Sequence, residues 1–226
     1  MTDRSNGLGS TAPLHRIGEC GVVPVVTLPD VTVALPLTEA LLAGGLGCVE
    51  VTFRTDAAAP ALPLIRQRFP DMLVGAGTVL TTRQADAAIE AGAQFVVAPG
   101  TNPVVIDHVL ARGVPMIPGI ATPTDIEAAL ARDIETVKFF PAEQFGGAST
   151  IKALAGPYPS VRYIPTGGIS PANLATYLAV PQVLACGGSW MVRAELLATR
   201  DFAAVTRLAR EAVAIVAEAR QAHPSA

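Results

Sequence analysis

The feature that most constrains the fold is an alternation of short β-branched runs with Ala- and Leu-rich stretches along the chain. The intervals between the starts of successive runs are 20 to 26 residues. Strands that alternate with helices at this interval are typical of βαβ units in a parallel sheet. Eight such units predict an α/β protein with the (β/α)8 TIM-barrel fold. The eight predicted strands begin near Val22, Cys48, Leu73, Phe95, Pro115, Thr136, Arg162 and Val183.

The sequence also predicts the domain organisation. No linker or change of composition divides the chain, so we expect a single domain over residues 1–226. Residues 1–20 are expected to form a short N-terminal leader or helix below the barrel, and residues 22–219 the barrel itself. Asn102, Thr122 and Ser170 each precede a proline and predict helix starts, because a side-chain cap before proline at the first helical position is favoured.

Charge and hydrophobicity disfavour a nucleic-acid or membrane partner, and cysteine usage indicates the cellular compartment. Sixteen basic and 19 acidic residues give a net charge of −3 without a basic cluster, which disfavours a nucleic-acid partner. Hydrophobic residues make up 50% of the chain, but their runs are far shorter than the roughly 20 residues of a membrane span. Residues 1–10 hold no signal-peptide core, and Cys20, Cys48 and Cys186 form no close pair. We therefore expect a cytoplasmic protein with buried free thiols.

Polar residues on the second predicted strand indicate a functional lumen. Alternate residues of a barrel strand face the lumen and the surrounding helices. Val49, Val51 and Phe53 form an apolar set that suits the helix side. Glu50 and Arg54 are therefore expected on the lumen side, toward the strand end where barrels place their active sites.

A lysine is expected in the same lumen. On the sixth predicted strand Val137 and Phe139 suit the helix side, which leaves Lys138 facing inward. A lumen lysine is costly unless it is paired or neutral, and a neutral amine can attack a carbonyl to form a Schiff base. Two interpretations remain open on these grounds: a catalytic lysine, or an interior ion pair between Lys138 and Glu50 without a catalytic role.

Glycine-rich turns follow the last two predicted strands. Gly167 and Gly168 follow the seventh strand, and Gly187, Gly188 and Ser189 follow the eighth. Glycines here allow backbone N–H groups to approach a phosphate, and barrels frequently bind phosphate after these two strands. The alternative is that they are only tight turns.

Two other kinds of site are not supported. The segment Gly75-Ala76-Gly77 does not match a dinucleotide fingerprint, because Leu80 stands where that motif needs glycine. His15, His108 and His223 lie far apart and form no metal-binding spacing. We expect no metal.

Five segments of the chain resemble the 2-keto-3-deoxy-6-phosphogluconate (KDPG) aldolase and 4-hydroxy-2-oxoglutarate (KHG) aldolase family. They are Glu50–Thr55 (EVTFRT), Gly75–Leu80 (GAGTVL), Lys138–Glu143 (KFFPAE), Pro165–Ser170 (PTGGIS) and Gly187–Trp190 (GGSW). The similarity extends from about Val22 to Ala219. The lysine segment and the double-glycine segments are its specific parts.

The resemblance implies roles for individual residues. It implies that Lys138 is the Schiff-base lysine, that Glu50 is the general acid/base, and that Arg54 and Thr78 hold the pyruvyl carboxylate. The other implied site residues line the site or hold the phosphate: Pro99, Phe140, Gly167, Gly168 and Ser189.

The resemblance also implies an activity. A class I aldolase, which is a lyase, would cleave KDPG to pyruvate and glyceraldehyde 3-phosphate in the Entner–Doudoroff pathway. It would work as a homotrimer through a covalent imine without a cofactor, with a side activity on KHG. Three alternatives stay open: an aldolase for the phosphogalactonate epimer, a phosphate-binding TIM-barrel epimerase or synthase, and a non-catalytic scaffold.

Overall fold

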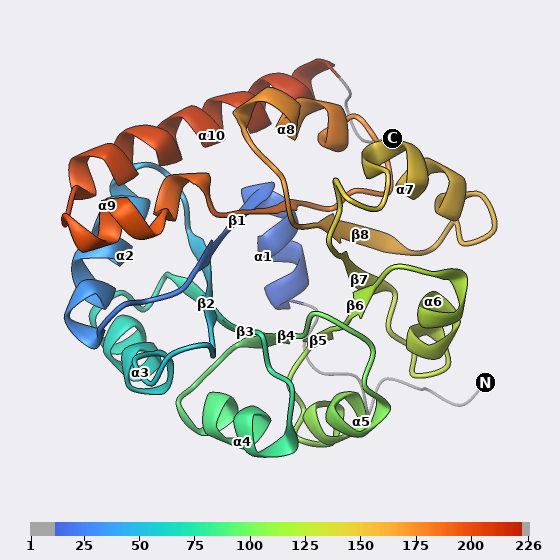
Figure 1. Ribbon diagram of the computed structural model, residues 1–226, viewed down its shortest axis with the longest axis horizontal. Coiled ribbons are helices and arrows are strands. Elements are labelled where there is room, and N and C mark those ends of the chain that lie inside the picture. The colour runs from blue at the N-terminus through green and yellow to red at the C-terminus, as the bar shows by residue number, and fades with distance from the viewer. Residues whose placement is uncertain (1–11, 223–226) are drawn as a thin grey trace.

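A computed structural model describes residues 12–222, and its strands form a ring surrounded by helices (Figure 1). Every strand pair in this part of the chain is parallel. The predicted strand starts are close to the observed ones, except that the last strand begins at Cys186 rather than near Val183. The strands are β1 Val22–Val26, β2 Cys48–Thr52, β3 Leu73–Gly77, β4 Phe95–Val97, β5 Met116–Ile117, β6 Gly119–Ile120, β7 Thr136–Phe139, β8 Arg162–Pro165 and β9 Cys186–Gly188.

The hydrogen bonding divides this ring into two sheets. One has the strand order β5-β4-β3-β2-β1-β9 and the other β6-β7-β8. The fifth predicted strand is split at Pro118, which cannot donate to a strand ladder; β5 pairs with β4 and β6 with β7. Between β8 and β9 only two isolated bridges form, Tyr163 with Val183 and Thr166 with Gly187. The eight strand–helix units of a TIM barrel are present, but the sheet is not continuously closed.

Helices cover the outside of the ring, and local capping explains where several begin. Asn102 accepts a hydrogen bond from the amide of Val104, and Thr122 and Ser170 each form a capping box, as predicted. The helices are α1 Ala12–Cys20, α2 Ala34–Ala43, α3 Ala58–Arg68, α4 Thr82–Glu90, α5 Pro103–Ala111, α6 Pro123–Leu130, α7 Gly147–Ala155, α8 Pro171–Leu178, α9 Ala194–Ala198 and α10 Phe202–Ala222, with 3-10 turns η1 Val31–Val33 and η2 Trp190–Val192.

The core has two layers, one between strands and helices and one inside the ring. Val49, Val51, Val137 and Phe139 belong to the outer layer, which confirms the predicted facing of β2 and β7. Ile17 of α1 is fully buried and belongs to the inner layer, together with Val23, Cys48, Leu73, Phe95, Val97, Ile117, Ile164 and Ala185. Cys48, Leu73 and Phe95 of this inner layer are the first residues of their strands, whereas Val97 is the last residue of β4. We call the inner layer the lumen floor.

The N-terminal region agrees in part with the sequence-based expectation. The helix expected within residues 1–20 is α1, and residues 1–11 lie outside the described part of the chain. We propose that the barrel and α1 form one domain. No helix among residues 12–222 is long and apolar enough to cross a membrane.

Candidate active site

A carboxylate and an amine meet above the lumen floor. Glu50 is the middle residue of β2 and Lys138 the third residue of β7, and each is only 4% exposed. Their facing atoms, Lys138 Nζ and Glu50 Oε1, are 3.3 Å apart. Both side chains, together with Ile17, line a small enclosed cavity of about 10 Å³. The floor closes the lumen from below, so the pair can be reached from the C-terminal mouth of the barrel.

Glycines on the neighbouring strand make room for this carboxylate. A Cβ built at Gly77 would lie 2.7 Å from both Cγ and Cδ of Glu50, and it would overlap Oε1. A Cβ at Gly75, one step deeper on β3, would overlap the ring of Phe95 instead. The sequence analysis treated Gly75-Ala76-Gly77 as a failed dinucleotide motif and as part of a family segment, and it missed the contact of Gly77 with Glu50. The signal was present in the alternation of glycines on one face of a strand.

Arg54 and Thr78 lie together at the mouth, two and one residues beyond the ends of β2 and β3. The Nε atom of Arg54 donates to the hydroxyl of Thr78 at 3.0 Å. Thr78 has a left-handed backbone with φ of 57°, which is uncommon for a β-branched residue. Arg54 is exposed, so its guanidinium keeps donors free for an anion.

Phe140 and Pro99 flank the lysine. The Nζ atom of Lys138 is 5.4 Å from the centre of the Phe140 ring, within the range of a cation–π contact. Gly119 pairs with Lys138 across β6 and β7, and a Cβ there would overlap the carbonyl of Pro99. The lack of a side chain at Gly119 thus lets the Pro99 turn come close to the lysine strand.

The second glycine-rich turn was expected after the last strand, but Gly187 and Gly188 are the last two residues of β9, paired with β1. This strand end meets the turn of Gly167 and Gly168. Gly167 and Gly168 both have a left-handed backbone, with φ of 99° and 81°. Thr166, the residue before them, forms an isolated bridge with Gly187, and a Cβ at Gly187 would overlap the Thr166 hydroxyl. A Cβ at Gly188 would overlap the Trp190 ring, and Ser189 is exposed beside it. The predicted phosphate residues therefore form one cluster at the ends of β8 and β9.

The side chain of Glu143 packs closely against Gly168, and the sequence did not indicate this contact. A Cβ at Gly168 would lie 2.7 Å from Cβ of Glu143 and closer still to Cγ. The hydroxyl of Tyr177 donates to Oε1 of Glu143. Burial, followed by this hydrogen bond, raises the pKa of Tyr177. Replacing Gly168 would thus disturb the packing of Glu143 as well as any bound anion.

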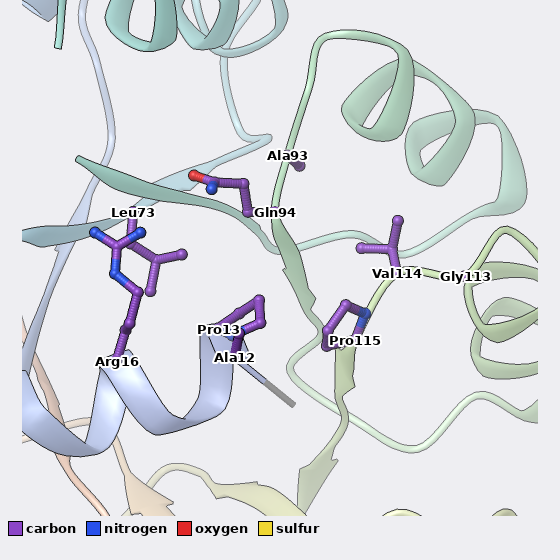
Figure 2. Close-up of a pocket in the computed structure, with 9 residues that line it drawn as sticks. All are labelled: Ala12, Pro13, Arg16, Leu73, Ala93, Gln94, Gly113, Val114 and Pro115. Atoms are coloured by element: carbon purple, nitrogen blue, oxygen red, sulfur yellow. The ribbon is translucent and has the colours of Figure 1, made fainter. Parts of the chain in front are cut away.

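A separate pocket opens at the opposite end of the barrel (Figure 2). It has a volume of about 330 Å³ and is lined by Arg16, Gln94 and Pro115 among others. Gln94 and Pro115 lie just before β4 and β5, so this pocket is at the N-terminal ends of the strands. None of its lining residues was predicted as a site residue.

The cysteines differ from expectation in one respect. Cys48 and Cys186 are buried, but Cys20 is only partly buried, so the prediction of three buried thiols is wrong for Cys20. Cys20 ends α1 and Cys48 begins β2, which brings the two thiols into contact at the lumen floor. A hydrogen bond from Cys48 lowers the pKa of Cys20 to about 7. Within residues 12–222 no group of three His, Cys, Asp or Glu side chains is placed to hold a metal ion.

Comparison with known proteins shows the family of this chain. A family model for KDPG and KHG aldolases matches residues 15–208. The 2-dehydro-3-deoxy-phosphogluconate aldolase of Treponema pallidum is 58% identical over 195 residues, which are 86% of this chain and 93% of the relative. This chain belongs to the KDPG and KHG aldolase family.

Solved structures of this aldolase family share the fold. KDPG aldolase from Zymomonas mobilis, solved with 3-phosphoglycerate, has a TM-score of 0.85 at 40% identity, covering 91% of this chain and 96% of its own. KDPG aldolase from Legionella pneumophila was solved with pyruvate captured as a covalent carbinolamine. Its TM-score is 0.85 at 38% identity, covering 88% of this chain and 96% of its own.

Proposed function

We propose that the chain is a class I aldolase that cleaves KDPG to pyruvate and glyceraldehyde 3-phosphate, with a side activity on KHG. The observation that carries this proposal is the buried pair of Lys138 Nζ and Glu50 Oε1, 3.3 Å apart above an apolar floor. Membership of the family, and a relative that holds pyruvate as a carbinolamine, support the same chemistry. The reaction fits the Entner–Doudoroff pathway.

The covalent step begins with the amine of Lys138. Its proton can pass to the adjacent Glu50 carboxylate, and the free amine then attacks the C2 ketone to give a carbinolamine. Glu50 returns this proton to the carbinolamine hydroxyl, which leaves as water, so that Glu50 is again a carboxylate and the resulting iminium withdraws electrons from C3. No metal is needed in these steps, because the iminium is the electron sink.

Bond cleavage then uses the carboxylate. Glu50 removes the proton of the C4 hydroxyl, directly or through one water, and the C4 oxygen becomes the aldehyde oxygen. The electron pair of the C3–C4 bond moves onto C3 and forms an enamine with the lysine nitrogen. Protonation of C3 and addition of water release pyruvate and restore the amine of Lys138. The other product is glyceraldehyde 3-phosphate.

The ends of the substrate have separate places in this proposal. The carboxylate binds the guanidinium of Arg54 and the hydroxyl of Thr78, because a planar guanidinium suits a carboxylate. The phosphate binds in the turn of Gly167 and Gly168, near Ser189 and the Gly187-Gly188 strand end. The left-handed backbone of Gly167 and Gly168 supports this, since such turns expose N–H groups to anions. Phe140 and Pro99 form the walls around the imine.

The proposal includes a homotrimer in the cytoplasm. The family resemblance implies the trimer, and the free thiols of Cys20, Cys48 and Cys186 suit the reducing compartment that the cysteine usage predicted. Light scattering on the purified chain would test the trimer directly.

Trapping of the imine tests the central step. Incubation with pyruvate and borohydride should add one reduced pyruvyl group, mapped by mass spectrometry to the peptide that holds Lys138. Lys138→Arg should abolish the adduct, because a guanidinium stays protonated and is a poor nucleophile. The chain's other lysine, Lys152, is exposed on α7 and serves as an internal control. An adduct at Lys152 alone would refute the assignment of Lys138, and the ratio of rates on KDPG, its galactonate epimer and KHG would establish the preferred substrate.

A further inference from the structure

Two threonines form a hydrogen-bonded pair at the mouth of the barrel, and neither has a role in the proposed mechanism; Thr27 lies outside the family segments, and Thr52 lies within Glu50–Thr55. Thr27 directly follows β1 and is exposed, whereas Thr52 is the last residue of β2 and is only 1% exposed. Their hydroxyl oxygens are 2.8 Å apart. A second contact, from the hydroxyl of Thr55 to the carbonyl of Leu28 at 2.8 Å, ties the same two loops together.

The register of β1 places Thr27 on the lumen side, next to the reacting atoms. Val25 is paired with Glu50, so Thr27 is one step nearer the mouth on the same face. Val23, of the same parity, belongs to the lumen floor. On its other edge β1 pairs with β9, where Pro24 lies opposite Gly188. Thr27 therefore stands on the strand between the acid/base carboxylate and the proposed phosphate turn.

Only one of the two hydroxyl protons of this pair takes part in the hydrogen bond between them. Each hydroxyl can donate one hydrogen bond, and one of the two donates to the other. Among the described residues, the hydroxyl of Thr52 has Thr27 as its only hydrogen-bond partner. Because an unsatisfied buried donor is unfavourable, Thr52 donates and Thr27 accepts. The exposed Thr27 hydroxyl then keeps its own proton for a ligand at the mouth.

We propose that Thr27, held by Thr52, is a specificity-determining residue that binds the C5 hydroxyl of the substrate. This inference rests on the proposed function. There the carboxylate, the ketone, the C4 hydroxyl and the phosphate each have a partner, and the C5 hydroxyl has none. C5 lies between C4, which reacts at Glu50 on β2, and the phosphate-bearing C6 near Ser189 after β9. The strand between those two is β1. The site thus selects phosphorylated 2-keto acids with a hydroxyl beside the phosphate-bearing carbon.

The test compares two aldehydes in the addition of pyruvate, which is the reverse reaction. Glyceraldehyde 3-phosphate carries the hydroxyl in question, and 3-phosphooxypropanal is the same molecule without it. Thr27→Val should lower kcat/KM for glyceraldehyde 3-phosphate by about tenfold and leave that for 3-phosphooxypropanal within about twofold. Thr27→Ser keeps a hydroxyl and should retain most of the preference.

A control variant separates hydroxyl recognition from a loosened loop. Thr55→Val removes the contact to Leu28 but leaves the lumen hydroxyls in place, so any change it causes should be equal for the two aldehydes. Equal losses on both aldehydes in Thr27→Val, or no loss on either, would overturn the proposal. The pyruvate adduct at Lys138 is measured on the same variants. Its presence in Thr27→Val shows that the proposed aldolase chemistry stands whichever way the aldehyde comparison falls.

Discussion

Gly77→Ala is the substitution that most directly tests whether the position of the Glu50 carboxylate matters. The added Cβ would lie 2.7 Å from both Cγ and Cδ of Glu50 and overlap its Oε1. Non-bonded carbons settle at about 3.5–4.0 Å, so the carboxylate must move by about 1 Å. The lumen offers little room for that movement, because Glu50 is 4% exposed and lies 3.3 Å from Lys138.

The expected effect is large on catalysis and moderate on stability. A displacement of about 1 Å at a reacting group costs on the order of 100-fold in rate, so kcat/KM for KDPG should fall by about that factor. Overpacking in a close-packed interior destabilises by about 1–3 kcal/mol, which leaves the chain folded. Steady-state cleavage with a coupled assay for pyruvate, together with urea unfolding, measures both quantities.

Two further variants test whether displacement of the Glu50 carboxylate causes the loss of rate in Gly77→Ala. Gly75→Ala overpacks the same strand face against Phe95 rather than Glu50, so it should destabilise similarly with a much smaller loss of rate. Glu50→Asp withdraws the carboxylate by one methylene, so in combination with Gly77→Ala it removes the overlaps at the Cδ and Oε1 positions and leaves only the one at Cγ. The double variant should therefore be more active than the product of the two single effects predicts. Activity of Gly77→Ala within threefold of the parent, or strict additivity in the double variant, would refute this account of Glu50.

Other expected outcomes concern the remaining groups. Glu50→Gln should slow cleavage by about 10²–10⁴-fold while the fold survives, since an amide cannot take a proton; near-normal turnover would make the ion pair structural. Ser189→Ala should lower kcat/KM for KDPG by about ten- to a hundredfold and leave KHG unchanged, whereas equal losses would show a disturbed barrel mouth. A chelator should leave the rate unchanged, and activity that a divalent metal restores would indicate a metal-dependent mechanism. Because the Cys48 thiol lowers the pKa of Cys20 to about 7, alkylation of Cys20 should accelerate as pH rises through about 7, when thiolate replaces thiol. Cys48→Ala should move that midpoint upward, and an unchanged midpoint would contradict the assigned cause.

The fold could be predicted from the sequence because the spacing of hydrophobic residues differs clearly between strands and helices. β-Branched runs placed the strands, and alternation along β2 and β7 placed Glu50 and Lys138 on the lumen side. The split of the fifth strand at Pro118 follows from a rule that the sequence already contained, since proline has no N–H to donate. The alternation of polar and apolar residues along a strand could not predict the distance between side chains on different strands.

Contacts across strands depend on register, and register is set by the whole ring. Thr27 and Thr52 are 25 residues apart, and nothing in either segment indicates that the two side chains meet. Only the pairing of Val25 with Glu50 brings the two hydroxyls together. The same holds for Gly77, whose importance depends on how far the Glu50 side chain reaches over β3. A pattern of period two shows which face a residue takes, but not what it meets there.

The geometry also favours one of the two interpretations of the lumen pair, the catalytic one. An ion pair that served only to hold the barrel together could be replaced by apolar residues at little cost, because burying both charges offsets much of their attraction. Apolar residues already fill the lumen floor just below, from Ile17 to Ile164, so the chain builds a packed interior where it needs one. At the next layer it instead leaves Gly77 without a side chain so that a carboxylate can lie against Lys138. Above that layer come Arg54, Thr78 and Thr27, which are polar and face the mouth. The lumen changes from apolar to polar toward its open end, and Gly77 leaves room for one carboxylate. This is the arrangement that we expect if a ligand enters from the mouth and reacts at the amine, as proposed.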